Sequence, residues 1–191
     1  MFAIHARYRG RERRRAQFVQ QSARALSTLK GVDEFTVVGV EDIASVITTA
    51  EAACDTIMAL IAGGDWAIGI GVLDSPTATR DDALVLAATA LGSSARGGTI
   101  KAKVKHDKNW ADSIQSAFSL LNYVLSRRTP EGREATSLMR SGFNQNEAAA
   151  ELGISKQAMS QRLQAAGWQA ELAGYRLAIQ IPAKRANREN A

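Results

Sequence analysis

Hydrophobic residues follow two different spacings over positions 1–128 of the chain. Where they recur at every second position, alternate side chains face one side of a sheet, so a strand is predicted. Where they recur at every third or fourth position, they form a stripe along a helix. The predicted strands are 1–8, 32–40, 66–73 and 99–105, and the predicted helices are 11–30, 41–62, 79–95 and 109–128. Such an alternation favours one sheet packed against helices, an α/β sandwich.

Two of the predicted strands carry a further signal. In 66–73, the small residues Ala67, Gly69 and Gly71 alternate with large ones, so one strand face is nearly bare. A bare face is typical of a close approach by a helix, a ligand or another backbone. In 99–105, apolar residues alternate with three lysines, Lys101, Lys103 and Lys105. This pattern predicts a half-solvated strand whose lysines discourage pairing with other chains at a sheet edge.

Beyond position 128 the pattern is helical throughout. Thr129 is suited to cap a helix, and Pro130 to occupy its first position. The helices predicted around the central segment are 130–140 and 168–181, the second ended by Pro182. We therefore place a boundary at 126–129. The expected parts are an α/β domain at 1–128, an all-α domain at 129–182 and a polar, disordered tail at 183–191.

Residues 144–167 predict two short helices joined by a tight turn. Gly153 suits a left-handed turn position, and Ser155 suits the N-cap of the second helix. That helix has Ala158, Met159 and Leu163 at the spacing of a buried face. Its other face contains no acid and consists of Lys156, Gln157, Ser160, Gln161 and Gln164.

This segment resembles the helix-turn-helix of DNA-binding proteins, with small Ala149 where the two helices cross. The resemblance implies that Lys156, Gln157, Ser160 and Gln161 face base edges, with Gln164 at the periphery. The candidates for phosphate contacts are Gln145, Ser155 and Arg162. Two other interpretations are a helical hairpin inside a larger core and a helix-turn-helix used for protein contact. A core hairpin would not leave one face entirely Lys, Gln and Ser, so we expect DNA binding.

The front half contains two short motifs of a known fold. VDEFTVV at 32–38 is similar to the Gly-Asp-Glu-Phe turn of class III nucleotide cyclases, diguanylate cyclases and the SatD family, and AIGIGV at 67–72 to their Ile-Gly-Ile strand. SatD-like proteins also place a helix-turn-helix after such a domain. Its signature, Ser-X-Gln-Ala-X-Ser-Gln-Arg-Leu, matches residues 155–163. The resemblance spans nearly the whole chain and implies a degenerate cyclase-like or ferredoxin-like front domain before the helix-turn-helix.

The chain departs from the cyclase pattern at its metal ligands. The resemblance implies one carboxylate in the Asp-Glu turn, here Asp33, and another at the end of the first strand, where Ala6 and Arg7 stand instead. One carboxylate facing an arginine does not supply the oxygen ligands that two Mg²⁺ ions need. We therefore expect no catalytic residues, no metal and no cofactor, with Asp33 paired to Arg7 or lying in a turn.

Basic residues are concentrated near the N-terminus. The net charge is +5, but positions 1–30 hold eight basic residues and one acidic residue. Six arginines lie close together, at Arg7, Arg9, Arg11, Arg13, Arg14 and Arg15. Such a cluster at a helix start is either a site for an anion or a solvated basic face. The single cysteine, Cys54, lies in an apolar pattern and is expected to be buried and inert.

These patterns together predict a bacterial transcription regulator that binds double-stranded DNA as a homodimer. No run is apolar enough for a membrane span and no secretory signal is convincing, so we expect a cytoplasmic protein. The front domain is expected to dimerise, to sense a small anionic or nucleotide ligand, or both. One alternative is a nucleotide-binding or nucleotide-converting cyclase-like protein whose helix-turn-helix is accessory or contacts protein. The others are an adaptor without chemistry and a non-specific architectural DNA binder.

Overall fold

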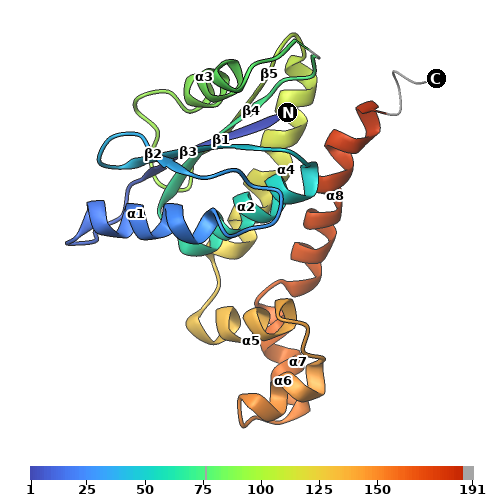
Figure 1. Ribbon diagram of the computed structural model, residues 1–191. Coiled ribbons are helices and arrows are strands. Elements are labelled where there is room, and N and C mark those ends of the chain that lie inside the picture. The colour runs from blue at the N-terminus through green and yellow to red at the C-terminus, as the bar shows by residue number, and fades with distance from the viewer. Residues whose placement is uncertain (76, 187–191) are drawn as a thin grey trace. The chain divides into compact units, whose positions relative to one another are not determined.

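The computed structural model describes residues 1–75 and 77–186, with side chains as far as Ile181, and shows a mixed α/β chain (Figure 1). The strands are β1 (Phe2–Tyr8), β2 (Thr36–Val37), β3 (Asp42–Ile47), β4 (Trp66–Val72) and β5 (Ile100–Val104). The helices in the front half are α1 (Arg15–Leu26), α2 (Ala50–Gly63), α3 (Arg80–Leu91) and α4 (Lys108–Ser126). Those that follow are α5 (Pro130–Arg140), α6 (Gln145–Glu151), α7 (Lys156–Ala165) and α8 (Trp168–Ala186).

The five strands form one sheet in the order β2-β3-β1-β4-β5. The central strand, β1, runs antiparallel to β3 and β4, β2 runs antiparallel to β3, and β4 and β5 are parallel. β1 is covered on both faces, since its neighbouring residues Ala3 and Ile4 are both fully buried. The single sheet with helices that the sequence predicts is confirmed.

Helices cover both faces of the sheet, with α3 on one side and α1 and α2 on the other (Figure 1). On the α1 side, the Phe18 ring lies 4.6 Å from that of Tyr8, and Tyr8 lies 5.3 Å from Trp66. On the α3 side, Gly69 and Gly71 of β4 lie directly under the helix.

The bare face of β4 is explained by the close approach of α3. A Cβ atom added at Gly71 would lie 2.7 Å from the backbone nitrogen of Ala87, and one at Gly69 would overlap the carbonyl oxygen of the same residue. Ala83 and Ala87 are themselves small and fully buried. The sequence allows a helix, a ligand or another backbone to approach this strand face, and the structure shows that a helix does.

The predicted helix at 41–62 is wrong in its first part, because Asp42–Ile47 forms β3. β3 is buried on both faces, and such a strand reads as a continuous apolar run that short-range periodicity does not distinguish from a helix. The predicted strand at 32–40 shrinks to β2, which a turn containing Gly39 (φ +93°) joins to β3. α2 starts only after Thr49, whose side chain accepts from the N–H of Ala52.

The start of α1 and the end of α8 also differ from the prediction. α1 begins at Arg15 instead of residue 11, and its first turn holds no acidic residue to favour the helix dipole. Pro182 does not end α8, which runs on to Ala186. A proline fits helical φ values but removes its own N–H bond and crowds the carbonyl four residues earlier, so a helix continues past it at a cost in stability. Residues 183–186 of the predicted tail are thus helical, and 187–191 lie outside the described residues.

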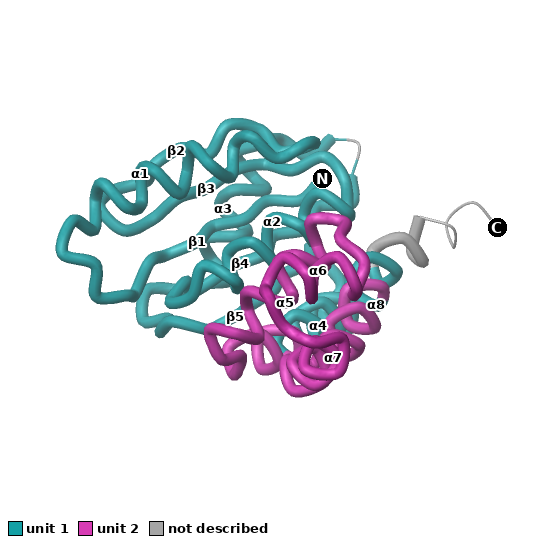
Figure 2. Tube along the Cα trace, turned by 90° about the horizontal axis from the view of Figure 1, so that it is seen from below, with its two compact units in different colours: residues 1–119, 177–191 teal, residues 120–176 magenta. Residues whose placement is uncertain are grey.

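The chain separates into two compact units (Figure 2). One comprises residues 1–119 with the end of α8 from Leu177, and the other residues 120–176. These limits fall inside α4 and α8, so the domain limits inferred from sequence stay predictions. In the part of the chain that the structure describes, no helix combines the length and apolarity that crossing a membrane requires.

Candidate nucleic-acid interface

Helix α5 precedes α6 and α7, the two helices of the predicted helix-turn-helix, and it starts as the sequence predicts. The Thr129 side chain accepts from the N–H of Gly132 over 3.2 Å, and Pro130 occupies the first helical turn. The backbone of Glu131 and the hydroxyl of Thr129 both hydrogen-bond the Glu131 carboxylate and lower its pKa. The charge of Arg162 lowers this pKa further.

The turn between α6 and α7 is fixed by local hydrogen bonds. Asn144 caps α6 by accepting from the N–H of Glu147 at 3.1 Å, while the Glu147 carboxylate accepts from the N–H of Asn144 at 2.8 Å. Gly153 has a φ of +62°, which confirms the left-handed position predicted for it. Ser155 then caps α7 by accepting from the N–H of Ala158 at 3.1 Å. Each helix start is thereby defined by residues within three positions of it.

A small buried core holds α5, α6 and α7 together. Its buried members are Ala135, Ala148, Ala149, Met159 and Leu163. Met159 is fully buried and Leu163 is 7% exposed, as the sequence predicts, whereas Ala158 is only half-buried. The alanines let the backbones approach closely, and the two large side chains of α7 then fix which face of that helix points outward.

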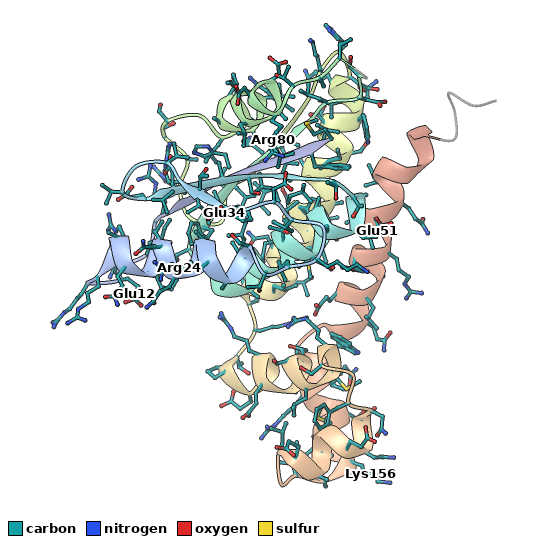
Figure 3. All side chains as sticks on the ribbon, in the orientation of Figure 1. Glu12, Arg24, Glu34, Glu51, Arg80 and Lys156 are labelled. Carbon is teal, nitrogen blue, oxygen red and sulfur yellow. The ribbon has the colours of Figure 1, made fainter. Side chains whose placement is uncertain are left out.

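The outward face of α7 is polar and contains no acid. All five side chains predicted for it are exposed, namely Lys156, Gln157, Ser160, Gln161 and Gln164. Lys156 extends away from the helix into solvent (Figure 3). Of the predicted phosphate contacts, Gln145 and Arg162 are half-buried, while Ser155 is exposed and its hydroxyl caps α7. The structure thus brings the predicted base-reading residues onto one helix face.

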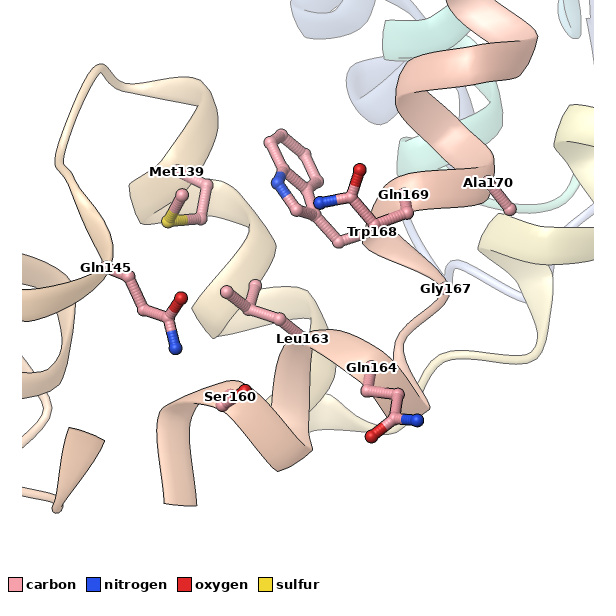
Figure 4. Close-up of a pocket in the computed structure, with 9 residues that line it drawn as sticks. All are labelled: Met139, Gln145, Ser160, Leu163, Gln164, Gly167, Trp168, Gln169 and Ala170. Carbon is pink, nitrogen blue, oxygen red and sulfur yellow. The ribbon is translucent and has the colours of Figure 1, made fainter. Parts of the chain in front are cut away.

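A hollow of about 470 Å³ lies beside this face (Figure 4). Its lining is Met139, Gln145, Ser160, Leu163, Gln164, Gly167, Trp168, Gln169 and Ala170. Three glutamines reach it from three different helices, α6, α7 and α8. The sequence analysis did not single out Gln169. The signal for it is Gly167, whose φ of +65° turns the chain sharply between α7 and α8 and returns the first turn of α8 to α7.

A buried ion-pair cluster fixes α8 against α5 and α7. The Arg128 Nη2 atom lies 2.6 Å from Glu171 Oε2, and these side chains are only 2% and 5% exposed. Arg128 also donates from Nε to the carbonyl of Ala166 at 2.7 Å, and Arg140 donates from Nε to Glu171 at 2.7 Å. Burial lowers the pKa of Arg128, and the bond to Glu171 opposes that shift. This cluster positions the Gln169 side of the hollow.

In the unit formed by residues 1–119, Arg7 belongs to an internal ion pair. It donates from Nε and Nη2 to Asp42 at 2.8 and 2.7 Å, and His5 lies 2.9 Å from the same carboxylate. Burial alone would raise the pKa of Asp42, but the bonds from Arg7 and His5 lower it below its ordinary value. The predicted pairing of Arg7 with Asp33 is wrong, since the β1–β3 register puts Asp42 opposite Arg7, and Asp33 pairs with Arg80.

The six N-terminal arginines differ in their ion-pair partners. Arg7, Arg9 and Arg15 are held by Asp42 and Glu41, with Arg9 Nη1 lying 2.9 Å from the Glu41 carboxylate. The other three, Arg11, Arg13 and Arg14, are exposed and precede α1. No salt bridge involves these three among the described residues. The candidate anion-binding surface is accordingly reduced to them.

Reactive and metal-binding side chains are dispersed. Within residues 1–75 and 77–186, no three His, Cys, Asp or Glu residues are grouped so that they could hold a metal ion. Cys54 is 1% exposed, and burial raises the pKa of its thiol to about 12, so the predicted burial is confirmed.

Comparison of the chain with family models, curated proteins and solved structures finds no match. The resemblance to SatD-like proteins and nucleotide cyclases therefore stays a prediction from short motifs. The candidate interface depends on the geometry of α6, α7 and the first turn of α8.

Proposed function

We propose that this protein is a cytoplasmic, sequence-specific DNA-binding transcription regulator without catalytic activity, in which α7 lies in the major groove. The single observation that carries the proposal is the exposed face of α7. It presents amide, hydroxyl and ammonium groups without a carboxylate, on a helix whose orientation a packed core defines. Glutamine amides read adenine edges, and lysine reads guanine. A carboxylate on that face would repel the phosphates on either side of the groove.

The roles follow from where each side chain lies. Base contacts are assigned to the exposed residues Lys156, Gln157, Ser160 and Gln161, with Gln164 at the periphery. Phosphate contacts are assigned to Gln145, Ser155 and Arg162. We add Gln169, because it shares the hollow with Gln145 and Gln164. Phosphate contacts hold the register of a helix on the duplex, and base contacts give sequence preference.

The charge distribution of residues 120–176 is consistent with this orientation. These residues hold seven basic and five acidic side chains. Glu131 and Glu147 lie at helix starts, and Glu171 is buried against Arg128. A modest positive excess also predicts a modest loss of affinity with salt, because few counterions are released on binding.

The test is the double variant Gln157→Ala plus Gln161→Ala. Each lost bidentate base contact costs about 1–3 kcal/mol, so the loss of two lowers affinity for a selected binding sequence by at least about thirtyfold. The matched control is Gln20→Ala plus Gln21→Ala, which removes two exposed glutamines from α1. Fluorescence anisotropy with labelled duplex measures both. Equal affinity of the two double variants for that sequence would refute the assignment.

A second candidate is a nucleotide-binding or nucleotide-converting protein in which α6 and α7 are accessory. The observation that favours it is the exposed cluster Arg11, Arg13 and Arg14. Thermal unfolding with and without ATP or GTP, and turnover assays with Mn²⁺, would detect such a ligand. A shift or turnover that is lost in the triple Arg→Ala variant supports this candidate and contradicts a purely structural front unit.

A further inference from the structure

The two edges of the sheet differ in charge. At the β5 edge, the exposed residues Lys101, Lys103 and Lys105 alternate with apolar ones, as the sequence predicts for a protected edge. At the other edge, β2 and the turn after it contain no charged residue over 36–40. Three valines there are exposed, Val37 by 45%, Val38 by 50% and Val40 by 66%. An exposed strand edge without charged residues offers unpaired backbone groups with which another strand can pair.

The backbone of β2 presents a free hydrogen-bonding pair at this edge. Val38 donates from its N–H to the carbonyl of Asp42 at 2.8 Å, and Val37 is opposite Ile43. Because backbone groups of an antiparallel strand point alternately to its two sides, the N–H and C=O of Val37 point away from β3. The neighbouring N–H of Phe35 is already bonded to the Ser27 hydroxyl at 2.8 Å. Val37 is therefore the centre of the available edge.

Three acids flank β2 closely, Asp33, Glu34 and Glu41. Glu34 is exposed, but when Val37 lies opposite Val37 it faces Val40 of the other copy and not another acid. Glu41 is held by Arg9 and Arg15, and Asp33 is held by Arg80. At the β5 edge, in contrast, pairing with a copy of itself would bring lysines opposite lysines, which is destabilising. Of the two edges, only the β2 edge suits self-association.

We propose that β2 pairs antiparallel with β2 of a second copy of this chain. The two-fold axis then lies between the two Val37 residues, each donating its N–H to the carbonyl of the other. Such an interface is self-complementary and closes at two copies. It joins the two sheets edge to edge and covers the exposed valines. The inference goes beyond DNA recognition, but a dimer would also supply the symmetry that reading two half-sites requires.

The first experiment measures the molar mass of the full chain without DNA by light scattering, so its outcome is independent of DNA binding. We expect twice the 20.5 kDa of one chain. Val37→Pro removes the outward N–H and leaves the Val38 bond to β3 in place, so it should yield monomer with an unchanged circular dichroism spectrum. The control is Val85→Lys, because Val85 lies in α3 and is 65% exposed. This variant should remain dimeric.

A second experiment tests the register. Directly opposed residues in a hydrogen-bonded antiparallel pair have Cα atoms about 5.5 Å apart, within the span of a disulfide. Val37→Cys should therefore form a disulfide-linked dimer under mild oxidation, and Val85→Cys should not. The native Cys54 is buried and does not compete. A monomeric wild type, or a dimer that survives Val37→Pro and is not cross-linked through Val37→Cys, would overturn the proposal.

Discussion

Replacing Glu171 by alanine should destabilise the unit of residues 120–176 more than any surface change in it. The Arg128 side chain is 2% exposed, so the variant leaves its charge buried without a counterion. Removing one partner of a buried pair costs about 3–5 kcal/mol, a large part of the roughly 5–15 kcal/mol by which a domain is stable. Arg140→Ala is the matched control: its side chain is 38% exposed and Glu171 keeps its pair with Arg128, so the loss of stability should be smaller than for Glu171→Ala.

Urea unfolding monitored by far-ultraviolet circular dichroism measures these differences on the full chain. The double variant Arg128→Met plus Glu171→Met should regain part of the loss, because neither charge is then buried alone. The recovery is expected to be incomplete, since the carbonyl of Ala166 loses the Arg128 donor. A loss below about 1 kcal/mol for Glu171→Ala, or a double variant no more stable than the single one, would contradict a buried Arg128–Glu171 pair.

Three further predictions concern the unit that contains the sheet. Gly71→Ala should lower the free energy of unfolding by about 1–3 kcal/mol, because the new Cβ overlaps α3. The control Gly63→Ala, whose Cβ has room within α2, should be neutral or stabilising. Urea titration measures the free energy of unfolding of both variants. The pKa of Asp42 is lowered on folding, so the stability that Asp42 contributes is present above its ordinary pKa of 3.8 and is lost as the pH falls through the lower folded pKa. Asp42→Asn should therefore flatten the acid side of a plot of stability against pH. An unchanged acid side would contradict the pairing with Arg7. The Cys54 thiol, with a pKa of about 12, should react with iodoacetamide at neutral pH only when urea unfolds the chain, as mass spectrometry would show; rapid labelling of the native protein would contradict its burial.

The parts of the fold that sequence predicts well depend on local interactions. Thr129, Gly153 and Ser155 define helix ends through bonds to residues a few positions away, so their roles follow from residue type. The exposed face of α7 follows from the burial of Met159 and Leu163 in the same helix. Helical spacing within one short segment therefore suffices to identify the candidate base-reading residues.

The parts that sequence does not predict depend on distant pairing. β3 looks helical because its strand partners, β1 and β2, supply the context that makes it a strand. The Arg7–Asp42 pair joins residues 35 positions apart, and only the register of two strands brings them together. Gln169 likewise enters the candidate site only because α8 folds back beside α7. Tertiary contacts decide each of these cases, and the sequence near Gln169 shows only the turn at Gly167.

Selection from a pool of random duplexes by the full chain shows whether α7 reads DNA sequence. Sequencing of the retained DNA should show one enriched motif, with inverted half-sites separated by about one helical turn, or 10–10.5 base pairs, if the protein is a dimer. The variant Gln157→Ala plus Gln161→Ala should lose this enrichment. Retained DNA without any enriched motif, with affinity that falls steeply as salt increases, or no retention of DNA at all, would contradict sequence reading by α7.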